Sequence, residues 1–98
     1  MAKFGDLISS EIPVLLCFYN SEIDTEQYQL TLAKVASDFS TKIKVIKIDV
    51  DKNTELSEAL KVKSCPSFIL YHNEEMIWRT SDYISSEKLT ETLHQFVS

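Results

Sequence analysis

Two apolar stretches, residues 14–19 and 68–71, constrain the fold of this chain more than any other part of it. Neither stretch alternates apolar with polar residues, as a strand with one solvent-exposed face would. Uninterrupted apolar strands are typical of sheets that are covered on both faces. Pro66 stands at the start of the second strand, where its missing N–H lies outside the hydrogen-bond ladder. We therefore expect two buried strands in a sheet that carries helices on each side.

The other segments alternate between helical and extended patterns. Helical spacing of apolar residues predicts helices over residues 3–10, residues 23–39, a short segment after residue 53, and the C-terminal segment. Ser85 is the expected N-cap of the last of these helices. Further strands are predicted over residues 43–48 and, through a hairpin at residues 72–75, over residues 76–80. The order is α-β-α-β-α-β-β-α. Strands that alternate with helices imply parallel pairing, and the hairpin adds an antiparallel edge. We expect an α/β fold with a mixed four-stranded sheet and helices on both faces.

Each of the three later helices has an apolar stripe that we expect to face the sheet. The members of these stripes are Tyr28, Leu32, Val35, Ala36 and Phe39 in the long helix, Leu56, Ala59 and Leu60 in the short one, and Leu89, Leu93, Phe96 and Val97 in the last. Acidic residues gather at the start of the long helix, where negative charge stabilises the positive end of the helix dipole.

Length and charge narrow the range of functions. The 98 residues suffice for one domain, which we place at residues 1–98. The net charge of −5 and the scattered basic residues argue against a nucleic-acid-binding role. No apolar stretch approaches the roughly 18 residues of a membrane span. The N-terminus lacks the apolar core of a signal peptide, so we expect a cytoplasmic protein that does not bind membranes.

The two cysteines, Cys17 and Cys65, are too few and too far apart for a disulfide framework or a zinc-binding spacing. We expect both to be free thiols, with Cys17 an inert residue of the core. Cys65 is either a small packing residue or a reactive thiol. Its sequence neighbourhood supplies little that would lower its pKa.

A metal site is not expected. The Asp49-x-Asp51-x-Asn53 pattern begins like a calcium loop, but Thr54 takes the place of the required glycine and Leu60 that of the final glutamate. The segment is better explained as a turn and a helix cap. His72 and His94 are expected at the surface. No cofactor-binding motif is present in the sequence.

Three segments of the chain resemble the thioredoxin family. They are P-V-L-L-C-F-Y (residues 13–19), K-I-D-V-D-K-N (residues 47–53) and V-K-S-C-P-S (residues 62–67), which resemble the family's central strand, its strand-and-turn K-x-D-V-D-x-N and its V-x-S-x-P-T. The resemblance implies a thioredoxin-like fold and a family role in cell redox homeostasis. It also implies that Pro66 is cis and that Cys65 lies beside a groove that binds extended peptides. The family's additional first strand is missing, which would make residues 43–48 a sheet edge.

The family's catalytic dithiol is absent from this sequence. Thioredoxins carry C-x-x-C at the start of the long helix, where the helix dipole lowers a thiol pKa. Here the degenerate position is occupied by Glu22, Ile23, Asp24, Thr25 and Glu26. The family's buried acid corresponds to Cys17 or Leu16, its hairpin glycine to Glu74, and its glycine near the groove to Asp82. We therefore expect no thioredoxin-type dithiol–disulfide oxidoreductase activity.

Three hypotheses about function follow. The leading one is a redox-inactive module that binds a protein or peptide through the groove at Cys65, Pro66 and Asp82. The alternative is a monothiol redox protein, in which Cys65 performs thiol–disulfide exchange, forms mixed disulfides or senses oxidants. A third is a structural subunit that uses the exposed strand edge at residues 43–48. The sequence names no partner.

Overall fold

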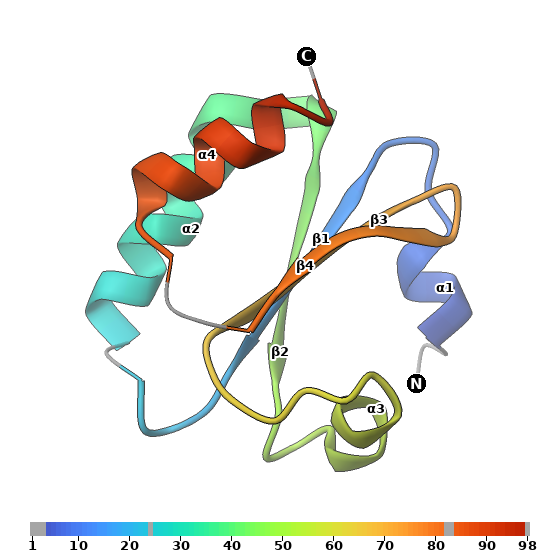
Figure 1. The fold of residues 1–98 in the computed structure, drawn as a ribbon, viewed down its shortest axis with the longest axis vertical. Coiled ribbons are helices and arrows are strands. Elements are labelled where there is room, and N and C mark those ends of the chain that lie inside the picture. Colours follow the sequence, from blue (N-terminus) through green and yellow to red (C-terminus); the bar gives the residue numbers. More distant parts are fainter. Residues whose placement is uncertain (1–3, 24, 82–83, 98) are drawn as a thin grey trace.

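The computed structural model describes residues 4–23, 25–81 and 84–97. The helices and strands are, in chain order, α1 (Phe4–Ile8), β1 (Val14–Tyr19), α2 (Thr25–Phe39), the 3₁₀ helix η1 (Ser40–Lys42), β2 (Lys44–Asp49), α3 (Thr54–Ala59), β3 (Ser67–His72), β4 (Glu75–Thr80) and α4 (Ser86–His94) (Figure 1). The predicted order is confirmed, and the predicted boundaries shift by one to a few residues. The predicted cap of the last helix is also confirmed, because the Ser85 hydroxyl accepts the N–H of Lys88.

The four strands form one sheet in the order β2-β1-β3-β4. In Figure 1, α2 and α4 lie side by side on one face of this sheet, and α1 and α3 lie on the other. The predicted mixed sheet with helices on both faces is therefore confirmed. The predicted strand at residues 43–48 does lie at a sheet edge, as β2.

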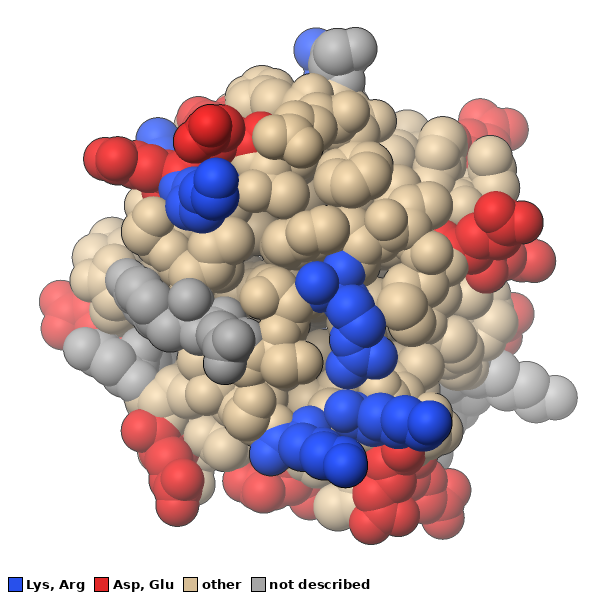
Figure 2. Space-filling model, in the orientation of Figure 1, with Lys and Arg blue, Asp and Glu red and all other residues tan. Residues whose placement is uncertain are grey.

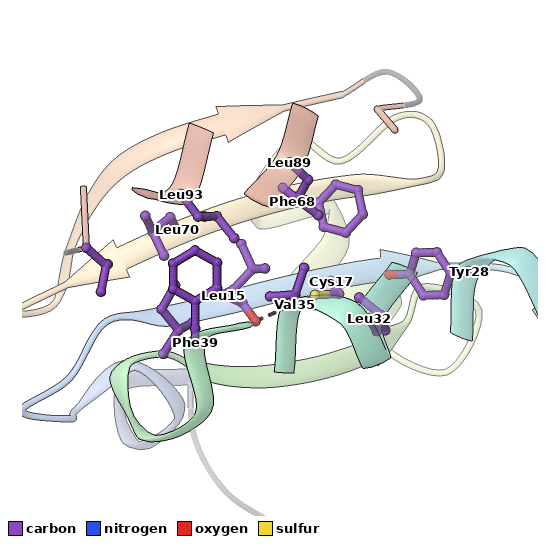
Figure 3. Close-up of a cluster of buried hydrophobic side chains, with 12 residues drawn as sticks. Leu15, Cys17, Tyr28, Leu32, Val35, Phe39, Phe68, Leu70, Leu89 and Leu93 are labelled. Atoms are coloured by element: carbon purple, nitrogen blue, oxygen red, sulfur yellow. Dashed lines mark hydrogen bonds between the residues drawn. The ribbon is translucent and has the colours of Figure 1, made fainter. Parts of the chain in front are cut away.

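The side chains of β1 alternate between two separate hydrophobic cores. Leu15 and Cys17 pack in the core beneath α2 and α4, which Figure 3 shows from the side. Val14, Leu16 and Phe18 pack in the opposite core, against α1 and α3. Both faces of the strand are apolar for this reason, which explains the unbroken apolar run in the sequence.

The direction of β3 differs from the prediction. β1 is parallel to β2, as predicted, but β1 and β3 are antiparallel. A parallel connection must return the chain along the whole length of a strand, about 20 Å for six residues. The six residues of α3 span only about 9 Å, and α3 lies beyond the end of β2 (Figure 1). The chain therefore enters β3 from the end of the sheet at which β2 finishes.

Three apolar residues that were predicted to face the sheet are exposed. Ala36 lies beside the buried stripe of α2, on the flank that turns toward solvent. In α3, Ser57 is buried in place of Ala59, and its hydroxyl donates a 2.9 Å hydrogen bond to the carbonyl of Asn53. Phe96 is 43% exposed, whereas Val97, whose N–H donates to the carbonyl of Leu93 at 2.9 Å, is buried.

The β3–β4 hairpin turns through two residues in the left-handed region, Asn73 with φ 55° and Glu74 with φ 66°. Two positive φ angles are what a two-residue type I′ turn requires, and this turn matches the twist of the strands that it joins. Glu74 thus occupies a backbone position that glycine adopts more easily.

Candidate functional site

A pocket of about 290 Å³ lies where the starts of α2 and β3 and the segment before α4 meet. Its lining residues are Glu22, Ile23, Gln27, Tyr28, Thr31, Cys65, Pro66, Phe68 and Ile84. The apolar side chains Ile23, Phe68 and Ile84 form much of its wall. Pockets of this kind, apolar with a few polar groups, are typical of ligand-binding sites.

Sheet topology brings these segments together. β1 and β3 are antiparallel, and Phe18 near the end of β1 pairs with Ser67 at the start of β3. The segment that follows β1 and the segment that precedes β3 must therefore lie at the same edge of the sheet. One of these segments leads into α2 and the other contains Cys65 and Pro66.

The segment before β3 is held by hydrogen bonds of two serine side chains. The Ser64 hydroxyl donates to the carbonyl of Ser81 at 2.7 Å, and the Ser67 hydroxyl donates to the carbonyl of Ser64 at 2.6 Å. The peptide bond between Cys65 and Pro66 is cis, the geometry that the family resemblance implies. These contacts tie the pocket wall both to β3 and to the end of β4.

Cys65 is a half-buried free thiol on the pocket wall. Burial, together with the negative charges of Asp51 and Asp49, raises the pKa of the Cys65 thiol above its ordinary value. Each of these causes favours the uncharged form. Because the thiolate is the nucleophile in thiol chemistry, the surroundings of Cys65 oppose reactivity at neutral pH.

Tyr28 separates the pocket from the core beneath it. Its ring lies at one end of the core (Figure 3), with its centroid 6.0 Å from that of Phe68. Its hydroxyl donates to the carbonyl of Phe18 at 3.3 Å. Burial raises the pKa of the Tyr28 phenol, so the side chain is neutral at physiological pH. Tyr28 therefore acts as the fixed floor of the pocket.

The structure brings together four of the residues that the sequence singled out, namely Glu22, Ile23, Cys65 and Pro66. Glu26 is exposed on α2 and does not line the pocket. Asp24 and Asp82 lie outside the described residues, as does the side chain of Thr25.

Sequence reasoning missed Gln27, Tyr28, Thr31, Phe68 and Ile84 as pocket residues. Helical spacing predicts only a core position for Tyr28 in the long helix. Its place in the first turn of that helix, close to the degenerate dithiol position, was the signal that could have identified it.

Neither a metal centre nor a membrane-spanning helix is found in the described part of the chain. Its His, Cys, Asp and Glu side chains form no group of three or more that could hold a metal ion. The Asp49–Asn53 turn uses its polar groups internally, since a carboxylate oxygen of Asp49 accepts the N–H of Asp51 at 2.9 Å. No described helix is both long enough and apolar enough to cross a bilayer.

The arrangement of sheet, helices and pocket defines a thioredoxin-like fold, and solved structures agree. A structure titled "Structure of a malarial protein" matches with a TM-score of 0.77 and 28% identity, over 86% of this chain and 96% of that one. A structure of thioredoxin-2, described as a component of malaria parasite protein secretion machinery, has a TM-score of 0.79 and 28% identity. That match covers 86% of this chain and 82% of the other.

The family model for the thioredoxin-like domain matches residues 2–98, so this chain belongs to the thioredoxin family. Thioredoxin-1 of Drosophila yakuba is 39% identical over 67 residues, which are 68% of this chain and 62% of that protein. Chloroplastic thioredoxin Y of Oryza sativa is 29% identical over 94% of this chain, but the match covers only 56% of the rice protein. The chain thus spans little more than half the length of these relatives. A thioredoxin-like protein of Synechocystis is 30% identical over 84 residues, which are 85% of this chain and 77% of that protein.

Proposed function

We propose that this thioredoxin-like domain is a protein-interaction module that holds an extended protein or peptide segment in its pocket without dithiol redox chemistry. One observation carries the proposal. The segment before α2, near the position at which thioredoxins have a cysteine pair, contributes Glu22 and Ile23 to a pocket that Cys65 and Pro66 also line.

The walls of the pocket suit an apolar side chain of such a segment. Ile23, Pro66 and Ile84 are partly exposed and offer apolar surface whose burial would stabilise the complex by about 25 cal/mol per Å². Thr31 lines the same pocket; its hydroxyl donates to the carbonyl of Gln27 at 3.1 Å and can still accept a hydrogen bond from a peptide N–H. This combination gives affinity through burial and orientation through a few polar contacts.

Two features argue against redox turnover. Clean disulfide exchange needs a thiolate and a second thiol close by, and the other cysteine, Cys17, is fully buried in β1. The raised pKa of Cys65 further reduces its thiolate fraction. The partial exposure of Cys65 on the pocket wall is what keeps monothiol chemistry as a second candidate function.

An insulin reduction assay with dithiothreitol tests the absence of redox turnover. We expect no acceleration over the dithiothreitol blank, whereas robust turnover would refute the proposal. Labelling of Cys65 with iodoacetamide at pH 7 tests the monothiol alternative. We expect a rate no faster than that of the unfolded chain, and a much faster rate would favour the alternative.

Selection from a phage library of random heptapeptides tests the binding role directly. We expect selected peptides to lose binding to the Ile84→Glu variant, which places a charge in the pocket, and to retain binding to Leu30→Glu. Leu30 is a suitable control because it is 61% exposed on α2 and does not line the pocket. Binding should also persist in Cys65→Ser. Peptides that bind equally well to the Ile84→Glu variant would contradict a role for the pocket.

A further inference from the structure

A second, smaller pocket adjoins the first and has a different chemical character. It has a volume of about 210 Å³ and is lined by Tyr19, Ile23, Tyr28, Gln29 and Lys47. Ile23 and Tyr28 line both pockets, so the two are neighbours across these side chains. An extended segment that occupied both pockets would pass over Ile23 and Tyr28, from Ile84 toward the side chain of Lys47 on the edge strand β2.

The second pocket is lined by the hydrogen-bond donor Lys47 and by the polar side chain of Gln29. The Lys47 ammonium donates to the side-chain oxygen of Gln29 at 3.4 Å, which orients it along the pocket wall. Tyr19 lines the same pocket, with its ring centroid 5.8 Å from that of Tyr28. No carboxylate of the described residues forms an ion pair with Lys47. An ammonium has three donors, so the hydrogen bond to Gln29 leaves two available.

The two pockets differ in charge. The first contains the carboxylate of Glu22 and no basic side chain, whereas the second contains Lys47 and no acidic one. An acidic side chain would therefore be repelled at the first pocket and attracted at the second. This difference would favour one direction for a bound segment that carries one apolar and one acidic residue.

From this juxtaposition we propose that the pocket at Tyr19, Gln29 and Lys47 is a carboxylate subsite. A segment that occupies both pockets places an apolar side chain against Ile84 in the first, and an Asp or Glu side chain against the Lys47 ammonium in the second. The partner is thus an extended acidic peptide segment. This inference rests on the proposed function and adds to it the chemical class of the ligand.

The same random heptapeptide phage library tests the subsite. We expect peptides selected on the wild-type chain to carry Asp or Glu at a fixed spacing from an apolar residue. Selection on Lys47→Glu should lose this preference or replace it with Lys or Arg. Lys44→Glu is the matched control, because Lys44 is also exposed on β2 and changes the net charge equally but does not line either pocket. Selection on this variant should keep the acidic preference.

The affinity of one selected acidic peptide gives the quantitative test. Lys47→Met keeps the aliphatic stem and removes the charge, so it should weaken binding by up to about fivefold, the range for an exposed ion pair. Lys44→Met should leave the affinity unchanged.

The possible outcomes separate this inference from the function on which it rests. Peptides that bind through Ile84 but show no acidic preference, or a preference that Lys47→Glu leaves intact, would overturn the carboxylate subsite and leave the interaction module standing. Failure to select any peptide that depends on Ile84 would overturn both.

Discussion

The thiol of Cys17 lies inside the sheet with none of its surface exposed, and its Sγ is 3.7 Å from the carbonyl oxygen of Leu15. Burial raises the pKa of this thiol far above its ordinary value of 9.0, and the nearby charge of Lys47 lowers it only in part. The folded chain therefore keeps the proton on Cys17 at pH values at which the unfolded chain has lost it. This difference couples the stability of the fold to pH.

We predict that the free energy of unfolding declines as the pH rises from 8 to 10. The stability contributed by a neutral Cys17 is fully present below pH 9.0 and is lost above it, by at most about 1.4 kcal/mol per pH unit. Urea unfolding at the two pH values measures the decline. Cys17→Ala is less stable throughout but should decline less steeply. Equal declines in the two proteins would show that Cys17 is not the coupled group.

Glu74 carries a backbone cost at the residue scale. A residue with a Cβ in the left-handed region is less stable there by about 1–2 kcal/mol, and glycine avoids this cost but loses more entropy on folding. We predict that Glu74→Gly raises the free energy of unfolding by up to about 1 kcal/mol in urea titrations. Glu75→Gly, which places glycine in β4 instead of the turn, should lower it. A destabilised Glu74→Gly would mean that the hairpin does not keep its positive φ angles.

At the scale of elements, the sequence predicted helices and strands correctly wherever a single hydrophobic pattern determines the secondary structure. Apolar runs and helical spacing identified the strands and helices, because burial on a given face has a fixed period. The direction of β3 could not be inferred in this way, since side-chain period is the same in parallel and antiparallel strands. The site was found only in part for a similar reason. Ile84 and Phe68 join Cys65 through tertiary packing, and no local pattern marks them as pocket residues.

The start of α2 offers a gain-of-function prediction. Ile23 lines the pocket beside Cys65 and Pro66, and Glu26 follows three residues later in the first turn of α2. We predict that the double variant Ile23→Cys with Glu26→Cys acquires measurable insulin reductase activity, because the helix N-terminus lowers the pKa of a thiol placed there. Ile23→Cys alone, which lacks the second thiol, is the control and should show much less turnover. An inactive double variant with an intact fold would mean that the other residues of the pocket prevent the reaction.

At the scale of the whole molecule, positive and negative side chains are interspersed on the surface shown in Figure 2. On the face shown in Figure 2, several Lys and Arg side chains gather near the lower centre and others lie beside Asp and Glu at the upper left, with wide uncharged areas elsewhere. The net charge of −5 would slow the approach of an acidic partner at long range. Local attraction at Lys47 would act only after encounter, since charges on the surface are screened beyond about 8–10 Å at physiological ionic strength.

The side chains of β1 alternate between the two cores, so each helical layer packs on its own set of β1 residues. A substitution in one layer therefore has little effect on the packing of the other. Leu15 and Cys17 support the layer of α2 and α4, which carries much of the pocket, whereas Val14, Leu16 and Phe18 support the layer of α1 and α3. Substitutions in one layer can accumulate without a matching change in the other, because the sheet stands between them. Such a chain can change on the side of the pocket while α1 and α3 continue to hold the same sheet, and a substitution near the start of α2 need not be compensated on the opposite face.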